Sequence, residues 1–135
     1  MVDRQGIPLA VLLTAANVHD SRMLEALLDA IPPLRGQRGR PRCRPTKLHA
    51  DKGYDYGRCR AACRARGIVP RIARRGIEST DRLGRHRWVV ERTLAWFNTR
   101  FRRLRVRDER RADMHEAFLT IGCALICWNY VTRLC

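Results

Sequence analysis

KLHADKGYDYGRCRAACRARGIVP, residues 47–70, predicts a strand, a helix and a second strand in immediate succession. The first strand covers Lys47 to Ala50 and ends at Asp51. The helix runs from about Tyr56 to Arg66, and Gly67 to Pro70 fits the second strand. Because strands and helices that alternate in this way are typical of α/β proteins, the predicted fold class is α/β.

The residues before this stretch continue the same pattern. Val2 to Thr14 predicts a β-hairpin, in which the turn Asp3-Arg4-Gln5-Gly6 precedes an apolar run from Ile7 to Leu13. Such a run is typical of a strand buried on both faces. His19-Asp20-Ser21 then offers capping residues for a helix that Pro32-Pro33 ends.

Two longer helices are predicted after this stretch. Leu83 to Arg103 has apolar residues at helical spacing, which predicts a stripe that faces the core. The members of this stripe are Val90, Leu94, Phe97, Phe101 and Leu104. A last helix, about Asp113 to Val131, is apolar nearly all round and is therefore predicted to be buried. Arg71 to Arg82 is polar and predicts a loop, and residues 1–135 together form one predicted domain.

The charge points to a polyanionic partner. The chain has 28 Lys and Arg residues against 13 Asp and Glu residues, a net charge of +15. A GC-rich coding sequence explains part of the preference for Arg over Lys but not the net charge, so nucleic acid is the leading partner. Two groups of arginines are predicted to contact the DNA backbone. They are Arg40 and Arg42 in an exposed basic loop at residues 34–45, and Arg100, Arg102, Arg103 and Arg105.

Neither a membrane nor a zinc site is predicted. The longest apolar run near the end is shorter than the roughly 20 residues that span a bilayer, and the beginning lacks a signal peptide, which predicts a cytoplasmic protein. Cys59 and Cys63, like Cys123 and Cys127, are four residues apart rather than at C-x2-C spacing. We therefore expect buried or half-buried free thiols.

Two carboxylates are candidates for chemistry. Asp51 follows a strand directly, which places it at the rim of a sheet, although a plain turn residue would fit equally well. Glu91 shares a sector of its predicted helix with Arg87, and a simple ion pair between these residues would also explain the spacing. The residues alone leave both pairs of alternatives open.

Two sequence blocks decide between these alternatives. They are Leu48-His49-Ala50-Asp51-Lys52-Gly53-Tyr54-Asp55 and Arg87-Trp88-Val89-Val90-Glu91-Arg92-Thr93. Four shorter segments occur in the expected order around them: Gly6-Ile7-Pro8-Leu9, Ala16-Asn17-Val18-His19-Asp20-Ser21, Trp96-Phe97-Asn98 and Phe101-Arg102-Arg103-Leu104-Arg105. Together they resemble DDE transposases of insertion sequences, of the insertion sequence five type.

The resemblance implies a ribonuclease H-like fold and an Asp, Asp, Glu triad around two Mg²⁺ ions, which Mn²⁺ can replace. Asp51 matches the second Asp and Glu91 the Glu of the triad, so both are expected to be catalytic metal ligands. Arg87 matches the Arg of the Tyr-Arg-Glu-Lys signature and is expected to support Glu91. The Tyr and Lys positions of that signature hold Gly84 and Asn98.

The implied function is DNA transposition by Mg²⁺-dependent phosphodiester cleavage and strand transfer. The partners would be transposon ends, target DNA and further copies of the chain, in a bacterial cytoplasm and at the nucleoid when DNA is bound. The first Asp is expected upstream of Val2, because Asp3 lies in a predicted turn and Asp20 is predicted to cap a helix. The fold would then be partial, without its first strand, and an upstream transposase segment would be needed for activity.

Two other functions fit the same residues. One is a non-catalytic DNA-binding remnant of a transposase, which would use the basic surface and no metal. The other is a metal-dependent nuclease or resolvase-like enzyme that cleaves DNA without strand transfer.

Overall fold

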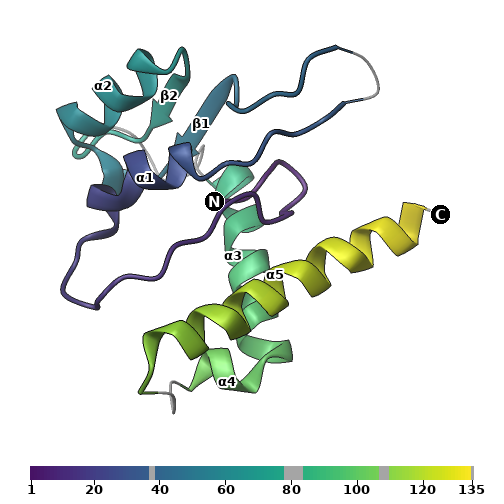
Figure 1. The fold of residues 1–135 in the computed structure, drawn as a ribbon. Coiled ribbons are helices and arrows are strands. Elements are labelled where there is room, and N and C mark those ends of the chain that lie inside the picture. Colours follow the sequence, from purple (N-terminus) through teal and green to yellow (C-terminus); the bar gives the residue numbers. More distant parts are fainter. Residues whose placement is uncertain (37–38, 78–83, 107–109, 135) are drawn as a thin grey trace. The chain divides into compact units, whose positions relative to one another are not determined.

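The computed structural model describes residues 1–36, 39–77, 84–106 and 110–134, with the side chains of 84–87 and 134 left undescribed. The chain forms two compact units. We call Thr14–Arg87 the sheet unit, and Met1–Leu13 with Trp88–Cys135 the helical unit. Figure 1 draws both along one chain. Among the described residues, no helix is long and apolar enough to cross a membrane.

The sheet unit has a mixed α/β structure. Its elements are η1 (Asp20–Met23), α1 (Leu24–Asp29), β1 (Lys47–Ala50), η2 (Lys52–Tyr54), α2 (Gly57–Ala65) and β2 (Val69–Ile72). The two strands pair in parallel, with Lys47 opposite Val69 and Ala50 opposite Ile72. The predicted strand at Lys47 to Ala50 and the predicted helix after it are confirmed. The strand predicted to follow that helix begins two residues later than predicted.

The core of the sheet unit lies where α1, α2 and the strands meet (Figure 1). The buried side chains of this core include Leu24, Leu28, Cys59, Cys63, Ile68 and Ile72. Burial raises the pKa of the Cys59 and Cys63 thiols, which keeps them in the neutral form that an apolar interior favours. The predicted buried thiols are thus confirmed at these two positions, whereas Cys43 is exposed.

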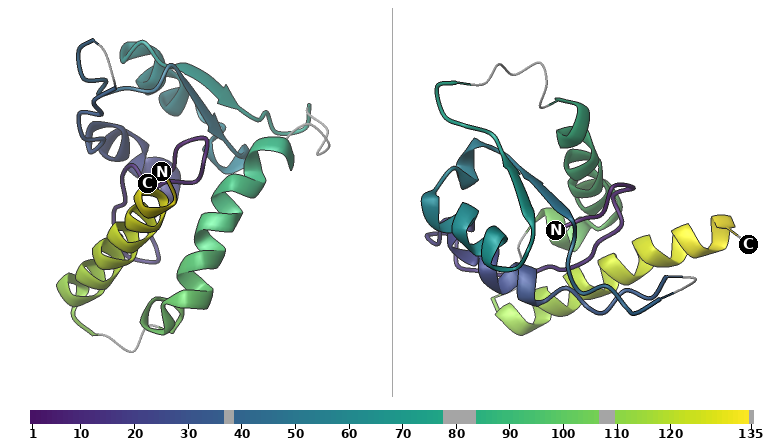
Figure 2. Two further views of the ribbon diagram at one scale, coloured as in Figure 1. Left: turned by 90° about the vertical axis from the view of Figure 1, so that its right-hand side faces the viewer. Right: turned by 90° about the horizontal axis from the view of Figure 1, so that it is seen from above.

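Between α1 and β1, the described residues 32–36 and 39–44 are exposed, and one bridge joins the two segments. Leu34 and Arg42 make an isolated antiparallel bridge, with N···O distances of 2.9 and 2.8 Å. The two arms of the loop run side by side away from β1 and α1 (Figures 1 and 2). The predicted basic loop is confirmed, and the bridge restricts the arms that carry Arg40 and Arg42. In the predicted loop of Arg71 to Arg82, Arg71 and Ile72 instead belong to β2, and residues 78–82 lie outside the described residues.

The helical unit contains α3 (Gly84–Arg100) from Trp88 onward, together with α4 (Arg102–Arg105) and α5 (Ala112–Leu134). The predicted helix from Leu83 to Arg103 ends earlier than expected. Phe101 leaves the helical conformation, with φ −118° and ψ 87°, and α4 begins after it. Position 83 lies outside the described residues.

The predicted core-facing stripe of α3 is wrong at two positions. Val90 and Leu94 are exposed, Leu94 by 55%, whereas Val89, Thr93 and Phe97 are buried. The buried face therefore lies about one residue away from the predicted one. Thr93 is accommodated there because its hydroxyl donates to the carbonyl oxygens of Gly6 at 2.8 Å and Val89 at 3.2 Å, which satisfies the buried polar group.

The prediction that the last helix is buried is also wrong. Gly122 and Ile126 are buried on α5, but Ile121, Leu125 and Trp128 are exposed, Trp128 by 63%. A helix that is apolar all round has two apolar faces, and one neighbour can cover only one of them. The covered face is the one that carries Gly122, where α3 and α4 approach: a Cβ on Gly122 would lie 2.9 Å from Cε1 of Phe97 and 3.4 Å from Cδ1 of Leu104.

The first residues form a turn but no strand. The carboxylate of Asp3 accepts hydrogen bonds from the backbone N–H groups of Gln5 and Ile7, both at 2.8 Å, and Val2 pairs with Pro8 in an isolated bridge. The predicted strand from Ile7 to Leu13 is absent from the described structure. A strand needs a hydrogen-bonded neighbour along its length, and among the described residues only Ile7 to Ala10 of this run have one, in the short segment Met1 to Asp3.

Candidate metal centre and nucleic-acid interface

Asp51 lies directly after β1, at the end predicted from the sequence. Its side chain is exposed and its Oδ1 atom accepts a hydrogen bond from the backbone N–H of Gly53 at 2.9 Å, which caps η2. A Cβ on Gly53 would come within 3.0 Å of the same oxygen. The Asp51 carboxylate therefore stabilises the turn after β1 and also has a fixed position at the rim of the sheet. The two alternatives left open by the sequence, a turn residue and a residue at the sheet rim, are both true of Asp51.

Asp20 is not the residue that caps the helix after it. His19 takes that place, because its Nδ1 atom accepts from the backbone N–H of Ser21 at 3.2 Å. Asp20 instead lies close enough to Tyr54 to affect its hydroxyl group electrostatically, as Asp51 also does. The pKa of Tyr54 is raised first by burial and then by the negative charges of Asp20 and Asp51.

Glu91 is exposed on α3, and the two residues after it anchor the helix. The guanidinium of Arg92 lies over two rings, 4.6 Å from the Trp88 centroid and 5.1 Å from the Trp96 centroid. Arg92 also donates to the carbonyl oxygen of Gln5. These contacts hold α3 against the N-terminal turn immediately beside Glu91.

Sequence reasoning missed Arg92 as a structural residue. The signal that would have revealed it is the spacing of Trp88, Arg92 and Trp96, four residues apart on one helix, which places a cation between two aromatic rings. Arg87 and Gly84 lie in the first turns of α3, where side chains are not described. The predicted Arg87–Glu91 contact therefore falls outside the described residues. Asn98 is exposed.

The two candidate ligands belong to different compact units, Asp51 to the sheet unit and Glu91 to the helical unit. Across the part of the chain that the structure describes, no three His, Cys, Asp or Glu side chains gather closely enough to hold a metal ion. The donor chemistry fits Mg²⁺, which prefers hard oxygen ligands and accepts one or two carboxylates per ion. Both side chains offer such oxygens at exposed positions.

All six predicted DNA-binding arginines are exposed. Arg40 and Arg42 lie in the basic loop of the sheet unit. The other four, Arg100, Arg102, Arg103 and Arg105, lie at the end of α3 and in α4. None of the six forms an ion pair with another described residue. Their positive charges are thus available to an anionic partner.

Comparison with known families identifies the chain. The family model described as "Transposase DDE domain" matches residues 1–129. The chain belongs to this family. The match extends over both compact units and contains Asp51 and Glu91.

A relative from Burkholderia cepacia, named "Putative transposase for insertion sequence element IS402", is 57% identical over 133 residues. The alignment covers 98% of this chain and 63% of the relative, so the chain spans less than two thirds of the relative's length. No solved structure matches significantly. The predicted membership among insertion-sequence DDE transposases is confirmed, and the insertion sequence five type stays a prediction.

Proposed function

We propose that this chain is the later part of a transposase catalytic domain that cleaves and rejoins DNA at the ends of an insertion sequence. The observation that carries the proposal is Asp51, an exposed carboxylate held at the end of a parallel strand inside a DDE-domain match. The sheet unit would form part of a ribonuclease H-like fold, with the first strand and the first Asp supplied by an upstream segment.

In this proposal Asp51 and Glu91 would hold Mg²⁺ through their carboxylate oxygens. When bound, Mg²⁺ would supply activation of the attacking water or 3′-hydroxyl and stabilisation of the leaving oxygen. The chain's own contribution is positioning. The hydrogen bond from Gly53 directs the Asp51 carboxylate, and the contacts of Arg92 and Thr93 hold the helix that carries Glu91. Arg87 would steady Glu91 or contact a phosphate.

The exposed arginines would bind the DNA backbone without reading its sequence. The DNA would be the transposon ends and the target, bound by more than one copy of the transposase in a bacterial cytoplasm. A polyanion would also relieve the repulsion of a chain with a net charge of +15.

The test uses the chain joined to an upstream transposase segment that carries the first Asp. Asp51→Asn and Glu91→Gln should each abolish Mg²⁺-dependent strand cleavage and leave DNA binding nearly unchanged, because each removes a negative oxygen ligand. Glu116→Gln removes an exposed carboxylate from α5 and should cleave like the wild type. Cleavage at the wild-type rate by either of the first two variants would remove that residue from the mechanism.

The same assay separates the other candidate functions. A joined protein that binds DNA but never nicks it in Mg²⁺ or Mn²⁺ would be a non-catalytic remnant. One that nicks without joining strands would be a nuclease. The 135-residue chain alone is expected to bind DNA and not to cleave it, since the triad would lack its first Asp.

A further inference from the structure

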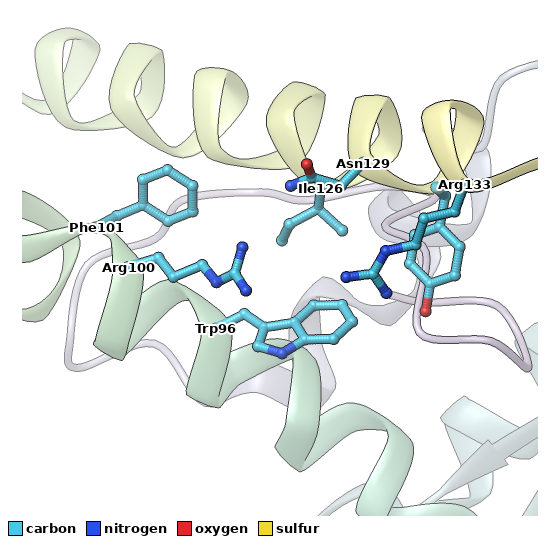
Figure 3. Close-up of a pocket in the computed structure, with 7 residues that line it drawn as sticks. Trp96, Arg100, Phe101, Ile126, Asn129 and Arg133 are labelled. Carbon is cyan, nitrogen blue, oxygen red and sulfur yellow. The ribbon is translucent and has the colours of Figure 1, made fainter. Parts of the chain in front are cut away.

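A pocket between α3 and α5 in the helical unit has a chemistry that the proposed metal site does not use (Figure 3). Its cavity volume is about 30 Å³, so it is a shallow hollow that lies open to solvent. Its residues include Trp96, Arg100, Ile126, Asn129, Tyr130 and Arg133. The buried side chain of Ile126 closes it on the α5 side, so the space is walled by two rigid helices.

The pocket is positively charged. Arg100 extends from the end of α3 and Arg133 from the end of α5, and both guanidinium groups point into the same space (Figure 3). Neither forms an ion pair with another described residue. Two like charges that face one hollow repel each other, and an anion between them removes that repulsion. The planar guanidinium fork fits phosphate oxygens in particular.

The pocket is also aromatic. The rings of Trp96 and Tyr130 are 6.2 Å apart with their planes tilted by 55°, and both side chains are half-buried. Arg92 holds them in place, because it lies over Trp96 at 5.1 Å and donates to the Tyr130 hydroxyl at 3.4 Å. Tyr130 in turn donates to the carbonyl oxygen of Gln5 at 2.5 Å. The rings are thus fixed before any ligand arrives.

We propose that this pocket binds one unstacked nucleotide of single-stranded DNA. The base would lie against Trp96 and Tyr130, and its phosphate between Arg100 and Arg133. The exposed amide of Asn129 can both donate to and accept from the edge of a base. The faces of a base inside a duplex are covered by its neighbours, so only a single-stranded or extruded nucleotide can use the rings. The proposal rests on the proposed function only in taking DNA as the partner.

The test compares two probes with the 135-residue chain in the absence of metal. One probe is a short fluorescein-labelled oligodeoxythymidylate, and the other is identical except that every base is removed. Fluorescence anisotropy should show that the wild type binds the intact probe about tenfold more tightly, since one stacked base contributes roughly that much. Equal affinity of the wild type for the two probes would overturn the proposal without the need for any variant.

Variants then locate the preference. Trp96→Leu should abolish it, Trp96→Tyr should retain most of it, and Trp128→Leu, which removes an exposed indole outside the pocket, should leave it unchanged. Arg133→Gln should lower the affinity for both probes. The loss should be larger than that caused by Arg110→Gln, which removes the same charge from an exposed position elsewhere. Circular dichroism confirms that each variant is folded. A base preference that survives in folded Trp96→Leu would place the base at another site.

A failure of the pocket proposal can be distinguished from a failure of the proposed transposase function. Duplex binding without any base preference would overturn the pocket and leave the transposase proposal intact. Cleavage that survives Asp51→Asn would overturn the metal site and leave the pocket untouched, because the pocket is assayed without metal.

Discussion

Asp55 joins separate parts of the sheet unit through one carboxylate. It accepts from the guanidinium of Arg60 on α2 at 2.6 Å and from the backbone N–H of Arg75 at 2.9 Å. Arg60 also donates to the carbonyl oxygen of Ile72 at the end of β2, at 2.9 Å. The hydrogen bond from Arg60, followed by that from Arg75, lowers the pKa of Asp55. Asp55, which belongs to the same sequence block as Asp51, is therefore a structural residue.

Asp55→Asn should lower the free energy of unfolding at pH 7. The size of this loss should depend on pH. The folded pKa lies below the unfolded value of about 3.9, so the stabilisation by the charged form is present above that value. It is lost as the pH falls through the folded pKa. Urea unfolding at pH 7, 5 and 3 should show the gap between wild type and variant narrowing toward pH 3.

Arg60→Gln supplies the control for this pair. Because the two residues share one interaction, the double variant should lose less stability than the sum of the two single variants. Full additivity, or a gap that stays constant with pH, would contradict the role given to Asp55.

Gly6 is required by both its conformation and its contacts. Its φ is +85°, and a Cβ there would lie 2.9 Å from the Thr93 hydroxyl oxygen and 3.0 Å from the Arg92 guanidinium. Gly6→Ala should therefore destabilise the chain by more than about 1 kcal/mol. Gly39→Ala is the matched control, since Gly39 has φ +93° and nothing within 4 Å of its Cβ position. Urea unfolding should show a clearly smaller loss of unfolding free energy for Gly39→Ala than for Gly6→Ala. Equal losses would show that the contacts with Thr93 and Arg92 contribute nothing to the effect at Gly6.

At the scale of the element, the crossing of α5 and α3 depends on Gly122. A Cβ on Gly122 would lie 2.9 Å from Cε1 of Phe97 and 3.4 Å from Cδ1 of Leu104. Overpacking a buried contact typically costs about 1–3 kcal/mol, and over most of that range the cost exceeds the gain of roughly 1 kcal/mol from replacing Gly by Ala in a helix. Gly122→Ala should therefore lower the melting temperature.

The control for that substitution is Gly57→Ala at the beginning of α2. Nothing lies within 4 Å of its Cβ position, so the better helix propensity of Ala meets no steric opposition. The melting temperature should stay the same or rise. If Gly122→Ala behaved in the same way, the two helices would be free to separate slightly at their crossing.

At the scale of the whole molecule, the excess of positive charge predicts how DNA binding responds to salt. The logarithm of the affinity for duplex DNA should fall linearly with the logarithm of salt concentration, by about 0.9 per phosphate neutralised. Replacing Arg102, Arg103 and Arg105 of α4 by Ala should make the slope shallower and weaken all DNA sequences about equally.

A control with the same loss of charge tests whether α4 itself contacts DNA. Arg64, Arg71 and Arg74 are exposed in the sheet unit, and their replacement by Ala also removes three positive charges. A smaller change of slope in this variant would locate the contacts at α4. Equal changes would show that total charge, rather than the position of the cluster, governs binding.

Elements whose signals are local could be predicted from the sequence. Lys47–Ala50 is the predicted strand, α2 lies within the predicted helix, and Asp51 follows the strand as expected. Gly, Pro and capping residues act on the backbone within a few residues, so these signals are readable before any packing is known. The blocks around Asp51 and Glu91 also sufficed to indicate the transposase family.

Which faces of the helices are buried depends on contacts that the sequence did not reveal. On α3 the apolar Val90 and Leu94 are exposed while Thr93 is buried, because the hydroxyl of Thr93 finds the carbonyl of Gly6, 87 residues away. The helix α5 exposes Trp128, because α3 and α4 approach it on the face that carries Gly122. Burial depends on partners that are distant in the chain, and amphipathic spacing along one helix carries no information about where those partners lie.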